Sequence, residues 1–225
     1  MKTSAHNLPN KTKALLLGAA ALGALVSQAI AATETITLTL PPGLCSTANN
    51  LNVGDNSLNA VLPGVPVESQ VLKFANNNYV ADIFDGSIWL DAATGEPSNT
   101  KISPGQGFFF FNPTSQELQV TLTGDVPQGV ITACFNPGFS LVGSPVPRPF
   151  SITTPNDLLP RVFEMQILRF DCATQRYRAI LFDGSTWIDA ATGNAANDVI
   201  PVGEGFFVFN PGFTPLCWTS NFSVQ

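Results

Sequence analysis

The sequence has little of what most catalytic and nucleic-acid-binding sites require. Charged residues make up only 12% of its 225 positions, and its one histidine is His6. Beyond the first residues, a serine or cysteine nucleophile therefore lacks the histidine that would activate it, and histidine-based metal sites are excluded as well. Acidic residues outnumber basic ones by 16 to 10, whereas nucleic-acid binding needs clustered positive charge. We expect no metal, no cofactor and no nucleic-acid partner.

The first 31 residues have the three parts of a secretory signal peptide. The apolar run Ala14–Val26 and the small residues of Ala29-Ile30-Ala31 follow a basic leader that contains Lys2, Lys11 and Lys13. This run is shorter than the roughly 20 residues that cross a bilayer, so we expect cleavage near Ala31 and no transmembrane anchor afterwards. Cleavage removes His6 and three lysines but no acid, which changes the formal net charge from −6 to −9. The expected location is the periplasm, the cell surface or the extracellular space.

The residues that are abundant indicate a β protein. Hydrophobic residues make up 44% of the chain, which also contains 17 phenylalanines, 18 glycines and 18 prolines. This composition is too apolar for a disordered chain. Short β-rich runs alternate with clusters of Gly, Pro, Asn and Asp, and this pattern predicts an all-β fold.

One stretch of the sequence occurs twice, at a constant offset of 98 residues. Residues 81–113 and 179–211 pair without a gap, and 20 of the 33 pairs are identical, which indicates an internal duplication. We expect a signal peptide over 1–31 and two homologous domains, 32–128 (the first half) and 129–225 (the second half). Each half is predicted to be a sandwich or partly closed barrel of about seven strands. A single intertwined β-structure is the alternative.

Each half contains a strand that is apolar on both faces. Alternate residues of Phe108–Phe111 point to opposite sides of a sheet, and Phe206–Phe209 repeats the pattern. A strand of this kind is covered on both sides, so we expect it in the middle of its sheet. Gly105-Gln106-Gly107 predicts a tight turn into the strand, because no Lys-Ser or Lys-Thr follows to make a phosphate loop.

The order of these motifs resembles a known class of repeat. Pro-Gly-Phe-Ser-Leu-Val-Gly-Ser-Pro (137–145), the strand Val71–Phe74, a tryptophan hairpin and Pro-Gly-Gln-Gly-Phe-Phe (104–109) are its parts. The chain is similar in this respect to tandem β-repeat domains of uncharacterised exported or cell-surface bacterial proteins. The likeness covers nearly all of the chain after the leader, although the first half departs from it at Cys45–Asn50. It implies export and a β fold, and it implies no activity.

The four cysteines permit two disulfides, with three possible pairings. They are Cys45, Cys134, Cys172 and Cys217. Cys172 and Cys217 both belong to the second half, and neither has a cysteine at the paired position of the first half. This favours a local Cys172–Cys217 bridge. Four buried free thiols are the alternative, and the absence of Cys-x-x-Cys gives no support to a zinc site.

The clearest candidate site is a short motif that both halves share: Asp85, Trp89 and Asp91, with the copy Asp183, Trp187 and Asp189. Its simplest interpretation is a hairpin turn beside a packed tryptophan. A second interpretation is a carbohydrate platform, in which exposed indoles stack on sugar rings. The carboxylates also suit a calcium loop, or the paired acids of a glycosidase, which lie about 5 to 10 Å apart.

A cluster of arginines distinguishes the second half, which contains Arg169, Arg176 and Arg178 where the first half has Lys73 alone. It predicts either a solvated face or a contact with an acidic polymer. Taken together, we expect an exported, non-catalytic structural or adhesive protein of the cell envelope or extracellular space. A cell-surface or matrix polymer, or a glycan, is the expected partner. The alternatives are a carbohydrate-binding module that uses Trp89 and Trp187, and a carboxylate-only glycosidase.

Overall fold

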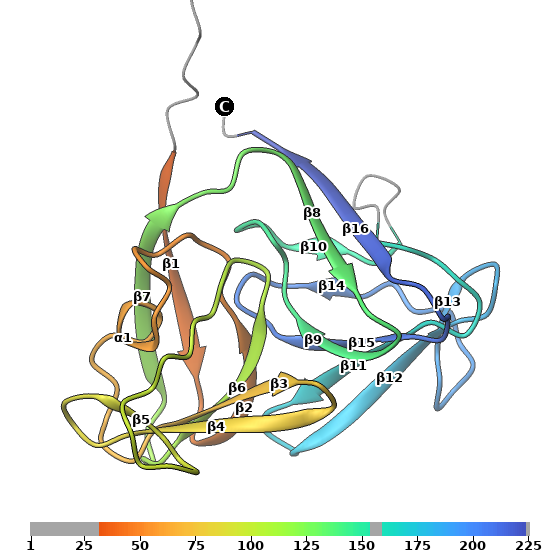
Figure 1. Cartoon of the computed structure of the whole chain (residues 1–225). Helices are drawn as coiled ribbons and strands as arrows, with labels where there is room; N and C mark the ends of the chain where they lie inside the picture. The colour runs from red at the N-terminus through yellow and green to blue at the C-terminus, as the bar shows by residue number, and fades with distance from the viewer. Residues whose placement is uncertain (1–31, 154–158, 224–225) are drawn as a thin grey trace, which may run out of the picture. The chain divides into compact units, whose positions relative to one another are not determined.

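Antiparallel sheets form nearly all of the regular structure (Figure 1). The computed structural model describes residues 32–153 and 159–223, so the predicted signal peptide and its cleavage site lie outside the described residues. Over these two ranges the one helix is α1 (Leu58–Val61), and the protein is all-β as predicted. Within the same ranges, no helix is long and apolar enough to cross a membrane.

The first half consists of a two-stranded ribbon and a five-stranded sheet. The ribbon pairs β1 (Thr33–Leu40) with β7 (Leu118–Asp125). The sheet has the order β2-β6-β3-β4-β5. Its strands are β2 (Gly43–Ala48), β3 (Gln70–Ala75), β4 (Asn78–Phe84), β5 (Trp89–Asp91) and β6 (Gly107–Asn112).

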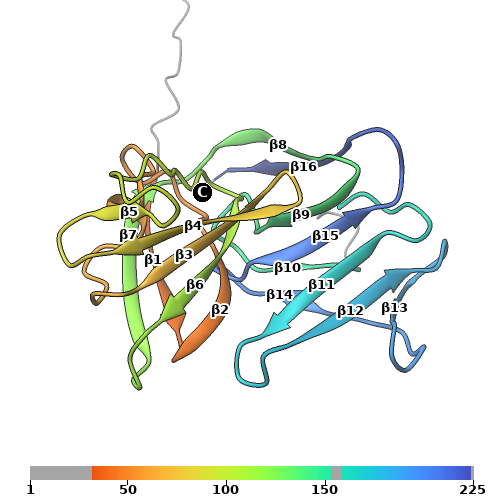
Figure 2. The ribbon, with the colours of Figure 1, turned by 60° about the horizontal axis from the view of Figure 1, so that its bottom comes forward.

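The second half has the same arrangement. Its ribbon pairs β8 (Gly129–Phe135) with β16 (Leu216–Phe222), and its five-stranded sheet has the order β9-β15-β11-β12-β13 (Figure 2). The sheet strands are β9 (Gly138–Val142), β11 (Gln166–Asp171), β12 (Arg176–Phe182), β13 (Trp187–Asp189) and β15 (Phe206–Asn210). A small sheet pairs β10 (Phe150–Ser151) with β14 (Val199–Ile200). None of the sheets in the described residues closes into a barrel, so that part of the expectation is not met.

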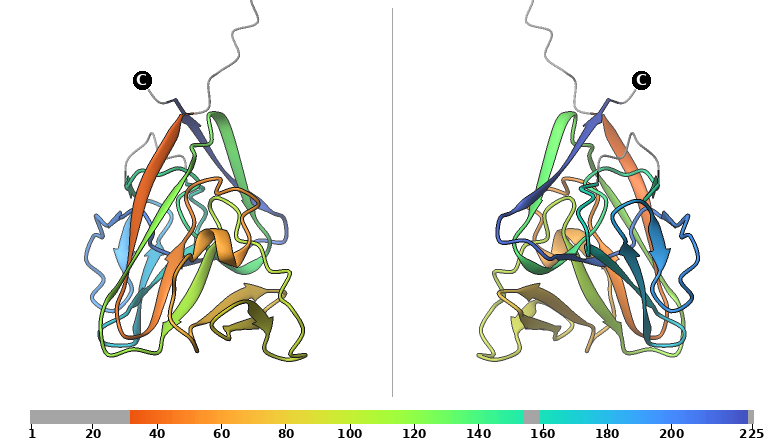
Figure 3. Two further views of the ribbon diagram at one scale, coloured as in Figure 1. Left: turned by 90° about the vertical axis from the view of Figure 1, so that its left-hand side faces the viewer. Right: turned by 90° about the vertical axis from the view of Figure 1, so that its right-hand side faces the viewer.

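The β1–β7 ribbon shows how an alternating sequence becomes a half-buried sheet. Leu38 and Leu40 are buried, and the exposed Thr37 lies with its hydroxyl oxygen 3.4 Å from that of Thr121 on β7. The buried leucines share a core with Leu58 and with residues of the five-stranded sheet, so α1 and the ribbon cover one face of that sheet (Figure 3).

The phenylalanine strand is central in both halves, which confirms the prediction from its unbroken apolar run. β6 pairs with β2 on one side and with β3 on the other. Phe108 and Phe110 face the core under the ribbon, whereas Phe109 belongs to a different cluster on the opposite face of the sheet. Both faces are therefore covered, and this explains why the strand does not alternate.

The cluster around Phe109 is shared by the two halves. Its buried members are Phe109, Leu141 and Phe207, and leucines and phenylalanines from both five-stranded sheets pack around them. The rings of Phe109 and Phe207 lie 6.2 Å apart between centroids, and Phe74 lies 5.0 Å from Phe207. The middle of the outer face of each five-stranded sheet is thus packed against the other half, while aromatic side chains at its edge stay open to solvent.

The glycine-rich turns explain how the two backbones approach so closely. The amide of Ala48 donates to the carbonyl of Gly203 at 2.8 Å, and the amide of Gly143 donates to that of Gly105 at 3.0 Å, so each turn binds a strand of the other half. A Cβ atom at Gly107 would lie 2.7 Å from the carbonyl oxygen of Val142. The Gly-x-Gly motif therefore does more than form the predicted turn, because it leaves room for the other half.

The predicted Cys172–Cys217 bridge is wrong. Cys45 pairs with Cys172, and Cys134 pairs with Cys217. Cys134 and Cys217 are directly opposite in the register of the β8–β16 ribbon, with 4.0 Å between their Cα atoms. Cys172 follows β11 in a turn that approaches β2 of the first half, where Cys45 is 4.8 Å away between Cα atoms. Cys172 pairs with the first half, and not within its own half, because that turn lies against β2.

Candidate functional site

The two tryptophans of the shared motif lie in the cores. Trp89 is 4% exposed and Trp187 is 1% exposed. Each packs against a phenylalanine of the neighbouring strand, Trp89 against Phe84 at 5.4 Å and Trp187 against Phe182 at 5.3 Å between ring centroids. An indole can stack on a sugar only where its face is open to solvent. The burial of both indoles therefore gives no support to carbohydrate recognition through Trp89 and Trp187.

The aspartates at the start of the motif hold hairpin turns. The Oδ1 atom of Asp85 accepts hydrogen bonds from the amides of Ser87 and Ile88 at 2.7 and 2.8 Å. Asp183 accepts from Ser185 and Thr186 in the same way. The backbone donor of Ile88, and that of Thr186 in the second half, lower the pKa of Asp85 and Asp183, because these bonds favour the charged carboxylate.

Asp91 and Asp189 hold the second turn of the motif. Asp91 accepts from the amides of Ala93 and Thr94, both at 2.9 Å, and the bond from Thr94 is the main reason that its pKa is lowered. Arg178 donates to Asp189 at 2.7 Å, and this bond is the main reason that the pKa of Asp189 is lowered. A glycosidase needs one carboxylic acid with a raised pKa, and all four aspartates shift the other way. The geometry supports the interpretation as hairpin turns.

Two of the three clustered arginines, Arg169 and Arg178, are held by acids, whereas Arg176 is exposed. Arg169 makes a two-pronged contact with Glu204 at 2.6 and 2.7 Å and also bonds Asp198 at 2.7 Å. Arg178 bonds both Asp189 and Asp198. The charges of Arg169 and Arg178 are paired within the second half. This pairing favours a structural role over contact with an acidic polymer.

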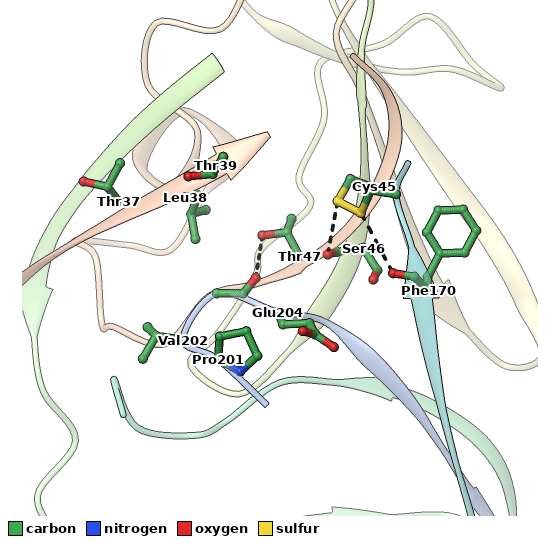
Figure 4. Close-up of a pocket in the computed structure, with 12 residues that line it drawn as sticks. Thr37, Leu38, Thr39, Cys45, Ser46, Thr47, Phe170, Pro201, Val202 and Glu204 are labelled. Carbon is green, nitrogen blue, oxygen red and sulfur yellow. Dashed lines mark hydrogen bonds between the residues drawn. A yellow bond between two sulfur atoms is a disulfide. The ribbon is translucent and has the colours of Figure 1, made fainter. Parts of the chain in front are cut away.

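A first cleft lies beside the disulfide that joins the halves. Its walls come from β1, β2 and the turn 201–204, and its volume is about 260 Å³ (Figure 4). Thr47 donates its hydroxyl to the carbonyl of Gly203 at 2.8 Å. The Cys45–Cys172 bridge closes one side, and the side chain of Gln175 donates to the carbonyl of Leu44 at 2.7 Å, which holds the same turn against β2.

A second cleft lies at the equivalent place beside the other ribbon, and it is larger. Its walls come from β8, β9, the turn 103–106 and the β3–β4 turn, and its volume is about 660 Å³. In the internal alignment, Ser140 stands at the position of Cys45 and Asn76 at the position of Cys172. A disulfide between the halves therefore cannot form here, and Cys134, which lines the cleft, is bonded to Cys217 within the β8–β16 ribbon. We call it the open cleft and the other the bridged cleft.

Aromatic side chains from both halves gather at one end of the open cleft. Tyr79, Phe139 and Tyr177 are 46%, 42% and 47% exposed, which is unusual for such large apolar rings. With Phe74, Leu168 and Phe207 they line a hollow of about 210 Å³, and Phe74 and Phe139 also line the open cleft. The hollow and the cleft are therefore adjacent, and we call the six residues of the hollow the aromatic rim.

The two tyrosines of the rim influence each other. Burial and the neighbouring Tyr79 raise the pKa of Tyr177, so its phenol stays uncharged at physiological pH. These are the only two tyrosines of the chain, one in each half at the offset of 98 residues. The sequence pairs the two tyrosines by this offset, but it does not show that they lie at one hollow.

Comparisons of the chain with protein-family models, with curated proteins and with solved structures gave no match.

Proposed function

We propose that the chain is an exported, non-catalytic protein of the cell envelope or extracellular space with a structural or adhesive role, akin to the bacterial tandem β-repeats that it resembles. The observation that carries the proposal is the Cys45–Cys172 disulfide, which links the halves across 127 residues. Together with Cys134–Cys217 it leaves no free thiol. Two such bonds indicate an oxidising compartment, and the leader-like first 31 residues agree with export.

A role in structure or adhesion agrees with how the halves are joined. A crosslink of this span stabilises the folded state by about 4 to 5 kcal/mol in the chain-entropy model. The shared phenylalanine cluster and the backbone bonds at the glycine turns act on the same junction. A body held together in this way presents a surface of constant shape, which is useful for attachment to a cell-surface or matrix polymer.

Export is tested by expressing the full chain with its leader in a bacterium and fractionating the cells. We expect the protein in the periplasm or medium, beginning at Ala32, with no thiol that reacts with maleimide after denaturation. Retention in the cytoplasm with four reactive thiols would contradict the proposal.

The non-catalytic, adhesive role is tested on the purified protein that begins at Ala32. We expect it to sediment with cell-envelope or matrix polymers and to leave glycoside substrates uncleaved. Turnover that is abolished by Asp85→Asn or Asp183→Asn, in variants that keep the fold, would instead establish the glycosidase hypothesis.

A further inference from the structure

The lining of the open cleft combines aromatic rings with neutral polar groups. Over residues 32–153 and 159–223, no charged side chain lines the cleft or its aromatic rim. Asn76, Asn77 and Asn136 line the cleft and are exposed, and within the described residues their side-chain amides have no hydrogen-bond partner. An amide both donates and accepts hydrogen bonds, as a sugar hydroxyl does. These groups are available to a ligand because the fold does not use them.

The chemistry of the lining selects among ligand classes. An acidic polymer would find no lysine or arginine in the cleft and would meet a protein whose formal net charge is −9 without its leader. A purely apolar ligand would leave the amides without partners, which is costly. A neutral sugar ring has an apolar face for the aromatic rings and hydroxyl groups at its edge for the amides. The volume of about 660 Å³ is typical of a ligand pocket.

The bridged cleft occupies the equivalent place in the fold and can be compared with the open cleft residue by residue. There the disulfide replaces Ser140 and Asn76, and Leu44 stands at the position of Phe139 in the internal alignment. Glu204 stands at the position of Gln106, and its carboxylate is occupied by Arg169. The bridged cleft is therefore smaller and lacks one of the exposed rings, which predicts one ligand per chain and not two.

From this arrangement we propose that the open cleft binds a neutral oligosaccharide or polysaccharide chain, with Tyr79, Phe139 and Tyr177 stacked on sugar rings and Asn77 and Asn136 bonded to sugar hydroxyls. The inference rests on the proposed adhesive function and names its partner by chemistry. The residues that contact the sugar are then the exposed rings at the junction of the halves, and not the buried tryptophans.

The binding test uses the oxidised protein from Ala32 onward and isothermal titration calorimetry. The probes are neutral hexasaccharides (β-1,4-glucan, α-1,4-glucan, β-1,4-xylan and β-1,4-linked N-acetylglucosamine), with a hexamer of galacturonic acid as the acidic control. We expect at least one neutral probe to bind with a stoichiometry near one and the acidic probe not to bind. Binding of no neutral probe, or of the acidic probe alone, would overturn the proposal.

Variants locate the site. Tyr79→Ala with Tyr177→Ala should weaken binding at least tenfold, and Phe139→Ala should act in the same direction. Asn136→Ala and Asn77→Gly remove amides without disturbing the core, and glycine suits the φ of 60° at Asn77. Each should weaken binding several-fold. Thr37→Ala with Thr39→Ala, in the bridged cleft, is the matched control and should change nothing.

Circular dichroism melting verifies that each variant is folded, and the amide variants keep the test decisive if the tyrosine pair unfolds. Unchanged binding in folded rim and amide variants would refute the site. A dimer in light scattering that the tyrosine substitutions dissociate, without sugar binding, would refute it in favour of an interface between copies. If the protein is exported and sediments with envelope polymers but binds no neutral sugar, the sugar site is refuted and the proposed function stands.

Discussion

At the scale of single residues, equivalent positions of the two halves carry different chemistry, and Asp82 is the clearest case. Asp82 on β4 is 1% exposed, and among the residues that the structure describes neither of its carboxylate oxygens has a hydrogen-bond partner. Ile180 stands 98 residues later on β12 and is fully buried. The nearby Lys73 donates to the carbonyl of Lys101 at 2.8 Å; burial lowers its pKa, and the charge of Asp82 opposes that shift.

Asp82→Ile should stabilise the protein. The substitution replaces a buried carboxylate that lacks a hydrogen-bond partner with isoleucine, the residue at the equivalent position 180. The expected gain is about 1 to 3 kcal/mol in the free energy of unfolding. Urea denaturation at pH 7 measures it. The matched control is Ile180→Asp, which should destabilise the second half. A loss of stability in Asp82→Ile would show that the carboxylate has a partner in solution.

The turn aspartates should make the stability of the protein sensitive to acid. Hydrogen bonds lower the folded-state pKa of Asp85 and Asp183 below their unfolded values of about 3.9. Their contribution to stability is therefore complete above about pH 4 and is lost as the pH falls through the lowered pKa values. Asp85→Asn with Asp183→Asn keeps an oxygen acceptor in each turn but removes the titration.

In the Asp85→Asn, Asp183→Asn variant, stability should depend less on pH between pH 5 and pH 2 than in the parent chain. Urea midpoints across that range measure the dependence. Glu96→Gln is the control, because the exposed Glu96 side chain is not a turn acceptor in the structure. An equal effect of the control would mean that overall charge, and not the turns, sets the acid sensitivity.

At the scale of elements, the two phenylalanine strands and the glycine turns before them form the junction. β6 is apolar on both faces because one face meets the core of the first half and the other meets β9 and β15 of the second half. Its first residue, Gly107, needs to be glycine because the backbone of β9 occupies the place of a side chain. The duplicated motif thus encodes a strand and the surface on which the other half packs.

Gly107→Ala should weaken that junction. Its Cβ would lie 2.7 Å from the carbonyl oxygen of Val142, closer than real contacts allow, and the backbone is less able to move than a side chain. The expected loss is about 1 to 3 kcal/mol, the usual cost of overpacking. Gly212→Ala is the control, since its nearest neighbour is a side-chain oxygen at 3.2 Å. Thermal melting of both variants checks the difference, and equal melting temperatures would contradict the close approach.

At the scale of the whole molecule, the halves are joined by a covalent bond as well as by packing. Trypsin digestion without reduction tests the pairing. We expect the peptide 170–176, which contains Cys172, to be linked to 32–73, and the peptide 102–161 to be linked to 179–225. A link between 170–176 and 179–225 would restore the local Cys172–Cys217 bridge.

The two disulfides should also differ in their effect on the junction. Cys45→Ser with Cys172→Ser removes the crosslink between halves and should lower the free energy of unfolding by about 4 to 5 kcal/mol. Cys134→Ser with Cys217→Ser removes a bond within one ribbon and is the comparison. Limited proteolysis should separate the halves more readily in the first variant only. Equal proteolysis of the two variants would show that packing alone joins the halves.

Much of the fold could be predicted because its signals are local. Alternation over residues 35–40 indicates the strand that the structure has as β1, the run Phe108–Phe111 indicates the central position of β6, and Asp-Gly indicates the hairpins. The candidate site could not be predicted in this way. Tyr79 and Tyr177 come from different halves, and nothing in the spacing of either repeat shows that they meet at one hollow.

By itself, the sequence determined an all-β chain whose two halves share their strand order, because periodicity, turn residues and internal likeness act over short distances. The tertiary structure alone decided that Trp89 and Trp187 are buried, that Cys45 pairs with Cys172, and that one cleft is bridged while its counterpart stays open. The physical reason is that burial and disulfide pairing depend on which surfaces come together. In this protein, apolar residues on the outer face of each five-stranded sheet pack against the other half.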